Sequence, residues 1–139
     1  MRLSRFMPVG LVLLAAGLAP ASALAADELR LELNAAEPQQ NRCQLSFLIE
    51  NRTAQNLEAL KLDLALFNTE GVIQRRLAVD LGPLRKAKTI VKAFGIETDC
   101  AAIGAILVND ITACPPMEPG ACLDQLALSA RPKAIKFYK

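Results

Sequence analysis

The sequence predicts an all-β protein, an antiparallel β-sandwich of about seven short strands with one short helix near the C-terminus. Three observations lead to this prediction. Apolar and polar residues alternate with a period of two over most of the chain, turn-forming residues separate the alternating runs, and no internal repeat or low-complexity linker interrupts them. A chain of 139 residues has room for one core of ordinary size.

The N-terminal segment has the three parts of a removable signal peptide, residues 1–25. A basic start precedes an apolar run at 9–18, and a small-x-small cleavage motif ends at Ala25. A membrane span is the alternative, but the run is shorter than the roughly 20 apolar residues that a span needs. We expect Sec-type export to the bacterial periplasm as a soluble product, with residues 26–139 forming a single β-sandwich domain.

Seven alternating or apolar runs are expected to be strands, at 29–33, 43–50, 57–67, 73–81, 89–96, 102–113 and 134–138. The run 57–67 is rich in helix-forming residues, but its strict alternation predicts a strand. Gly71 lies in the turn before the next run, where a positive φ is expected. In the run 89–96, Lys92 is an exception on the otherwise apolar face.

The C-terminal part of the chain is less regular. The continuous apolar run 102–111 predicts a central strand buried on both faces. Gly104 within that run marks either close packing or a bulge. Residues 123–130 fit a short helix and a strand equally well, so both stay open.

Four cysteines follow the leader, and an even count in an exported chain predicts two disulfides. A strand over 102–113 would hold Cys100 and Cys114 at opposite ends, farther apart than the roughly 7 Å that a disulfide allows between Cα atoms. In an up-and-down strand order, the strands that begin at Cys43 and after Cys100 run the same way and share an end. The expected pairs are Cys43 with Cys100 and Cys114 with Cys122.

Charge is balanced in total but uneven along the chain. Loss of Arg2 and Arg5 with the leader leaves 14 of 16 basic residues against 14 acidic ones, a balance that argues against nucleic-acid binding. Residues 97–124 contain five acids and no base, whereas 72–92 contain one acid and six bases. These bases are Arg75, Arg76, Arg85, Lys86, Lys88 and Lys92. We expect solvated surfaces; the alternative is weak contact of the basic stretch with an anionic membrane surface.

Catalytic chemistry is poorly supported. The chain has no histidine, which removes Ser-His-Asp and Cys-His catalysis and the histidine-bearing zinc and copper sites. Two of the acids Glu97, Asp99 and Asp110, which lie near one another in sequence, could form a catalytic acid pair. Surface acids are expected instead, because no aromatic-lined cleft is indicated. The lack of a Cys-x-x-Cys motif favours structural disulfides over redox chemistry. We expect no enzyme activity, cofactor or metal.

One short segment suggests a binding loop. Between Cys114 and Cys122 the chain contains three prolines and a methionine. A disulfide-closed ring of this composition is expected to be extended and exposed, and such preorganisation lowers the entropy cost of binding. Pro115, Pro116 and Met117 are therefore candidate interaction residues of a protease-inhibitor loop. The simpler interpretation is a stapled connection between the last strands.

A resemblance rests on residues spread from Cys43 to Phe94. They are Asn51-Arg52-Thr53, the run 60–71, Leu84, and Lys88-Thr89 ahead of Phe94. On these residues the chain resembles exported bacterial proteins with an immunoglobulin-like β-sandwich of the FxLYD type. It is also similar to uncharacterised exported alphaproteobacterial proteins often labelled by a twin-arginine signal, which this leader lacks. Asn51-Arg52-Thr53 fits a glycosylation sequon but is expected to be a turn.

The resemblance implies a periplasmic accessory or binding module, and it implies no catalytic residue. We expect a non-catalytic interaction module stabilised by two disulfides. Its unknown protein partner would pair with a sheet edge or meet the basic residues around Arg75 and Arg76. A protease-inhibitor-like protein that presents the 114–122 ring is the alternative function.

Overall fold

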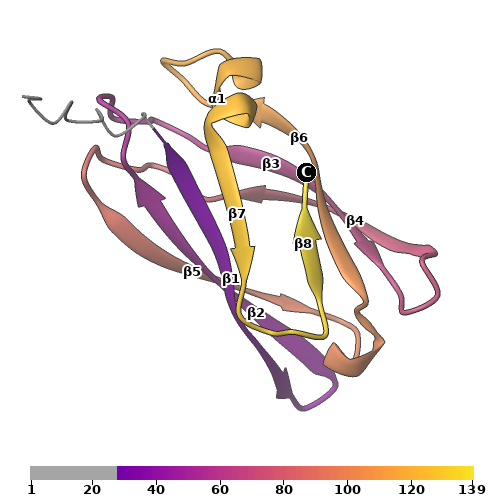
Figure 1. The fold of residues 1–139 in the computed structure, drawn as a ribbon. Coiled ribbons are helices and arrows are strands. Elements are labelled where there is room, and N and C mark those ends of the chain that lie inside the picture. The colour runs from indigo at the N-terminus through magenta and orange to yellow at the C-terminus, as the bar shows by residue number, and fades with distance from the viewer. Residues whose placement is uncertain (1–27) are drawn as a thin grey trace, which may run out of the picture.

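The structure is a computed structural model that describes residues 28–139, in which two four-stranded sheets pack face to face (Figure 1). The strand order is β5-β2-β1-β7 in the first sheet and β4-β3-β6-β8 in the second. The strands are β1 (Leu29–Gln39), β2 (Arg42–Asn51), β3 (Lys61–Phe67), β4 (Ile73–Asp80), β5 (Thr89–Ile96), β6 (Ala105–Ala113), β7 (Leu126–Ala130) and β8 (Lys136–Tyr138). A 3-10 turn, η1 (Cys100–Ala102), and one α-helix, α1 (Pro119–Gln125), complete the fold. The predicted all-β sandwich with a short helix near the C-terminus is confirmed, and the predicted leader lies outside the described residues.

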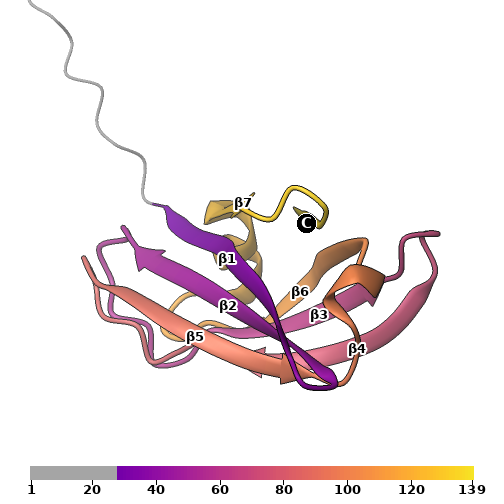
Figure 2. The same cartoon turned by 90° about the horizontal axis from the view of Figure 1, so that it is seen from below.

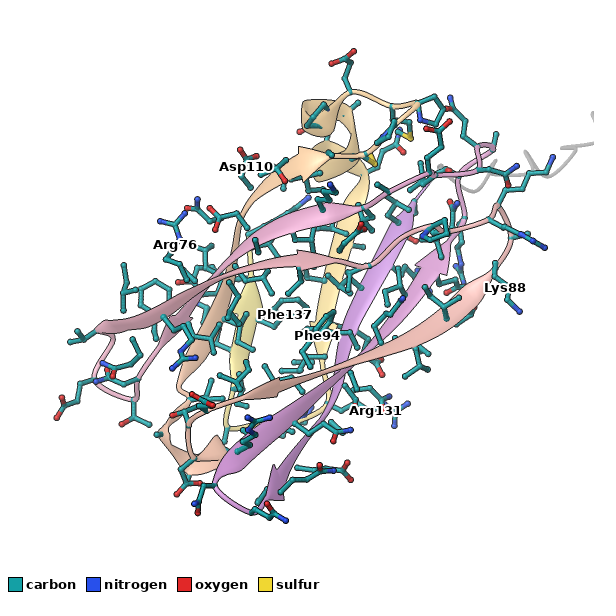
Figure 3. All side chains as sticks on the ribbon, turned by 180° about the vertical axis from the view of Figure 1, so that it is seen from behind. Arg76, Lys88, Phe94, Asp110, Arg131 and Phe137 are labelled. Atoms are coloured by element: carbon teal, nitrogen blue, oxygen red, sulfur yellow. A yellow bond between two sulfur atoms is a disulfide. The ribbon has the colours of Figure 1, made fainter. Side chains whose placement is uncertain are left out.

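A single apolar core fills the space between the sheets because inward residues alternate with outward ones along β1 and β2. Phe47 of β2 is buried near its centre. The Phe47 ring centroid lies 6.2 Å from that of Phe94 and 5.8 Å from that of Phe137 (Figure 3). Since Phe94 comes from β5 of the same sheet and Phe137 from β8 of the opposite sheet, this aromatic cluster joins the two layers.

Strand β3 begins later than expected. The prediction of a strand over 57–67 is wrong for its first four residues. Leu60 is buried on the face that the alternation assigns to it, and Leu57, which the alternation would place on the other face, is buried as well. Leu57 forms an isolated bridge with Leu84, and the Glu58 backbone N–H donates to the Pro115 carbonyl oxygen at 2.9 Å. The backbone before β3 is therefore bonded to two loops instead of a neighbouring strand.

Strand β6 is also shorter than expected and is buried on one face only. Ile106, Val108 and Ile111 are buried, whereas Asn109 and Asp110 are exposed, so the prediction of burial on both faces is wrong. The second sheet has the core on one side and solvent on the other. The continuous apolar sequence of β6 therefore does not mean that a second layer covers its outer face.

Two glycines have the roles that the sequence predicts. Gly71 has a φ of 81° in the turn between β3 and β4, a conformation that residues with a side chain rarely adopt. Gly104 lies against the backbone at Asn68, so that a Cβ atom there would stand 2.5 Å from the Asn68 carbonyl oxygen. The close-packing interpretation of Gly104 is thus confirmed.

Residues 123–130 contain both a helical and a strand segment. Helix α1 ends at Gln125 and β7 follows directly. Strand β7 pairs in parallel with β1, and β8 pairs in parallel with β6, so the expected antiparallel order does not hold for the last two strands. After β6 the chain crosses through α1 to the far edge of the first sheet before it returns to the second, and these crossings make the parallel pairs possible.

Both predicted disulfides are present. Cys43 and Cys100 have Cα atoms 4.9 Å apart and join the start of β2 to η1. Cys114 and Cys122, with Cα atoms 6.5 Å apart, join the chain after β6 to α1. Disulfides of this kind persist in oxidising compartments. Among residues 28–139, no helix has the length and apolar character needed to cross a membrane.

Candidate functional site

Strand β4 forms one edge of the second sheet and, within the described residues, pairs only with β3. Its first four residues, Ile73–Arg76, are exposed on both faces, whereas Leu77 and Val79 are half-buried. Val72 and Ile73 expose 54% and 56% of their surface. The β3–β4 hairpin therefore extends past the core (Figure 1), and the apolar face predicted for 73–81 is covered only from Leu77 onward.

Arg76 has a specific partner on the outer face of this hairpin. Its Nε donates to Oδ1 of Asp63 at 3.2 Å, and its Nη2 donates to Oδ2 of the same carboxylate. Asn109 also donates to Asp63 Oδ2, at 2.8 Å, from a register shift between β3 and β6 that places one extra residue in β6. Hydrogen bonding from Arg76, followed by that from Asn109, lowers the pKa of Asp63.

Arg75 lies on the other face of the same strand. It is opposite Leu66 in the β3–β4 register, and Leu66 is buried, so Arg75 belongs to the inward face of β4. No hydrogen bond or ion pair to the Arg75 side chain occurs within residues 28–139. Arg75 and Arg76 are adjacent in sequence but lie on opposite faces of β4, Arg75 on the inward face and Arg76 on the outer face.

Arg75 lines a small open hollow of about 100 Å³ between the start of β4 and the end of β5. The remaining lining residues are Leu66, Phe67, Gln74, Ile96, Glu97, Thr98, Ala102 and Ile103. Leu66, Ile96 and Ile103 are buried core residues. Buried apolar side chains and Arg75 therefore both line the hollow.

The predicted basic stretch does not form one patch. Arg75 and Arg76 lie at the start of β4, whereas Arg85, Lys86 and Lys88 lie in the connection to β5. Figure 3 shows Arg76 and Lys88 toward opposite ends of the sandwich. The two groups of basic residues are close in sequence but far apart in space, because the extended strand β4 lies between them.

The proline-rich ring is more ordered and less exposed than expected. Met117 is half-buried and packs against the core, and its N–H donates to the Cys114 carbonyl oxygen at 2.8 Å. Helix α1 begins at Pro119, inside the ring. The expectation of an extended ring is therefore wrong, because α1 begins inside it. The expected exposure holds for part of the ring only: Pro116 and Gly120 are exposed, whereas Met117 is half-buried and the disulfide is buried. Of the three candidates, Pro116 is exposed and Pro115 is half-buried.

The acids weighed as a pair have separate roles. Glu97 accepts a hydrogen bond from Arg42 at 3.2 Å, and Asp99 caps η1 by accepting from the Ala101 N–H at 3.1 Å. Asp110 lies within β6, on the second sheet. In the part of the chain that the structure describes, no three His, Cys, Asp or Glu residues gather as metal ligands would.

Asn51 is a structural residue whose importance the sequence did not reveal. Its side chain is fully buried; Nδ2 donates to the carbonyl oxygens of Gln55 and Leu84, and Oδ1 accepts from the N–H and Oγ1 of Thr53. The Ala87 N–H donates to the Asn51 carbonyl oxygen at 2.8 Å. Asn51-Arg52-Thr53 thus forms a turn, as predicted, and the side-chain amide of Asn51 is buried. The two-residue spacing of Asn and Thr is the signal that pointed to that turn.

In comparisons with known proteins, no protein-family model, curated protein or solved structure matched this chain.

Proposed function

We propose that this protein is a non-catalytic interaction module of the bacterial periplasm, and that its partner pairs with β4 as an extended strand. The observation that carries the proposal is the unpaired edge of β4, whose first half is exposed on both faces beside the Arg75 hollow. A strand edge presents free backbone N–H and C=O groups, and an extended segment of another chain can pair with them.

Export is supported by the leader pattern together with two disulfides. The strand order, with β5-β2-β1 facing β4-β3-β6, supports the immunoglobulin-like class that the FxLYD resemblance implies. The absence of histidine and the separate partners of Glu97 and Asp99 support a non-catalytic role.

The edge of β4 is a better docking candidate than the proline-rich ring. The Pro115 carbonyl oxygen already accepts from Glu58, and Met117 packs against the core. A ring bound to its own protein in this way has fewer free groups to offer a protease. Within residues 28–139, no strand pairs with the outer edge of β4, and residues Ile73–Arg76 are exposed.

Site-specific photo-crosslinking in the cells that make the protein tests the proposal. The variant Gln74→p-benzoylphenylalanine places the crosslinker on β4. Two control variants carry the same crosslinker elsewhere. One is at Ser129 on β7, an edge strand of the first sheet, and the other is at Met117 in the proline-rich ring. We expect one defined protein adduct at position 74 and none at the controls. An adduct at position 117 instead would favour the inhibitor alternative, and the absence of an adduct at position 74 would refute docking at β4.

A further inference from the structure

The sandwich has one closed side and one open side. Strands β7 and β8 contact each other across the two sheets on the closed side, whereas β4 and β5 are the edge strands on the other. Figure 2 shows β7 and the C-terminal end along one side, with β4 and β5 along the opposite one. The open side is the strip bordered by β4 and β5, and the Arg75 hollow lies at one end of it.

Both edge strands of the open side carry a cation on the face that should be apolar. Arg75 is opposite buried Leu66 in the β3–β4 register, and Lys92 is opposite buried Phe47 in the β2–β5 register. Lys92 lies between Ile90 and Phe94 on that face and is half-buried. Neither cation has a hydrogen-bond or ion-pair partner among residues 28–139.

The surrounding charges leave these two cations available. Arg76 is occupied by Asp63 on the outer face. Glu97, which is the only acid among residues 28–139 that lines the hollow, accepts from Arg42. A strand added to β4 would cover the inward face of Arg75, and an unpaired buried cation is unfavourable. An entirely apolar strand is therefore disfavoured, as is usual where edge strands carry inward charges.

We propose that the strand accepted by β4 carries an inward carboxylate, from aspartate or glutamate, that pairs with Arg75, and apolar side chains at the alternate inward positions that cover the hollow. This inference rests on the proposed function and names the chemistry of its partner segment. The guanidinium group binds a carboxylate through two parallel hydrogen bonds. The unpaired cation thus selects for an acidic segment and against other extended chains.

Peptide binding to the purified, oxidised protein tests the inference. The probes are fluorescein-labelled peptides as long as β4 in which valine and threonine alternate, and in which each valine in turn is replaced by glutamate or by glutamine. We expect at least one glutamate peptide to bind about tenfold more tightly than its glutamine counterpart. Added salt should weaken the glutamate peptide selectively.

Two variants of adjacent residues provide the matched comparison. Arg75→Gln should abolish the preference for glutamate, whereas Arg76→Gln removes the same charge from the same strand and should keep it. Thermal unfolding of both variants checks that they are folded. Equal binding of glutamate and glutamine peptides, or no binding by any peptide, overturns the inference, and the proposed function then stands if position 74 still crosslinks in cells. An equal loss in both variants also overturns it, because the effect would be one of net charge.

Discussion

The buried side-chain amide of Asn51 donates a hydrogen bond to the carbonyl oxygen of Leu84, 3.1 Å away and 33 residues later in the chain. This bond ties the end of β2 to the connection between β4 and β5. Asn51→Ala would leave the Leu84, Gln55 and Thr53 groups without this partner, so we expect a loss of about 2–4 kcal/mol in the free energy of unfolding. Urea denaturation measures it.

The control for this substitution is Asn56→Ala. Asn56 also accepts from a backbone N–H, that of Lys86 at 2.9 Å, but at an exposed site. We expect a loss below about 1 kcal/mol, because water can replace that partner. Equal losses in the two variants would contradict the structural role of Asn51.

The two disulfides should contribute unequally to stability. The Cys43–Cys100 bond joins residues that are 57 positions apart in the sequence, whereas the Cys114–Cys122 bond joins residues that are 8 positions apart. In the chain-entropy description these closures stabilise the fold by about 4 and about 2.5 kcal/mol. The double variant Cys43→Ala/Cys100→Ala should therefore have a lower melting temperature than Cys114→Ala/Cys122→Ala, by calorimetry under oxidising conditions. The reverse order would show that native contacts of the short ring dominate.

The ion pair of Asp63 with Arg76 should make stability depend on pH. Because the folded-state pKa of Asp63 is lowered by Arg76 and then by Asn109, its carboxylate stabilises the fold above the unfolded pKa of about 3.9, and this contribution is lost as pH falls through the folded pKa. The melting-temperature difference between the wild type and Asp63→Asn should thus narrow on acidification. A difference that stays constant as the pH falls would contradict this role of Asp63.

Gly104 should tolerate no side chain. A Cβ atom there would lie 2.5 Å from the Asn68 carbonyl oxygen and 2.9 Å from the Thr69 Cα atom. Gly104→Ala must displace backbone, and we expect a loss of about 1–3 kcal/mol in unfolding free energy. Gly120→Ala has no atom within 4 Å of the new methyl group and should be neutral or slightly stabilising within α1. Calorimetry of both variants decides whether the contact is as close as described.

The candidate surface was only partly predictable. The sequence identified Arg75 and Arg76 as neighbours in a basic stretch, and alternation placed Lys92 on an apolar face. It could not show that Arg76 pairs with Asp63, because that contact depends on the register of β3 and β4. The ring prediction failed for a related reason: composition favours exposure of Met117, but the packing of α1 and the disulfide against the core decides its burial.

Local pattern determined the class of fold and excluded one of the three cysteine pairings, and an assumed up-and-down strand order then selected the pairing that the structure has. A period of two forces one face of each strand inward whatever its neighbours are, and the length of an extended strand separates Cys100 from Cys114. Tertiary structure decided the parallel pairing of β7 with β1 and of β8 with β6, and the single covered face of β6. It also decided that Arg75 on β4 and Lys92 on β5 have no partner among residues 28–139. These features depend on which strands become neighbours and on which edges stay open, and those choices follow from burial of the whole core rather than from any one segment.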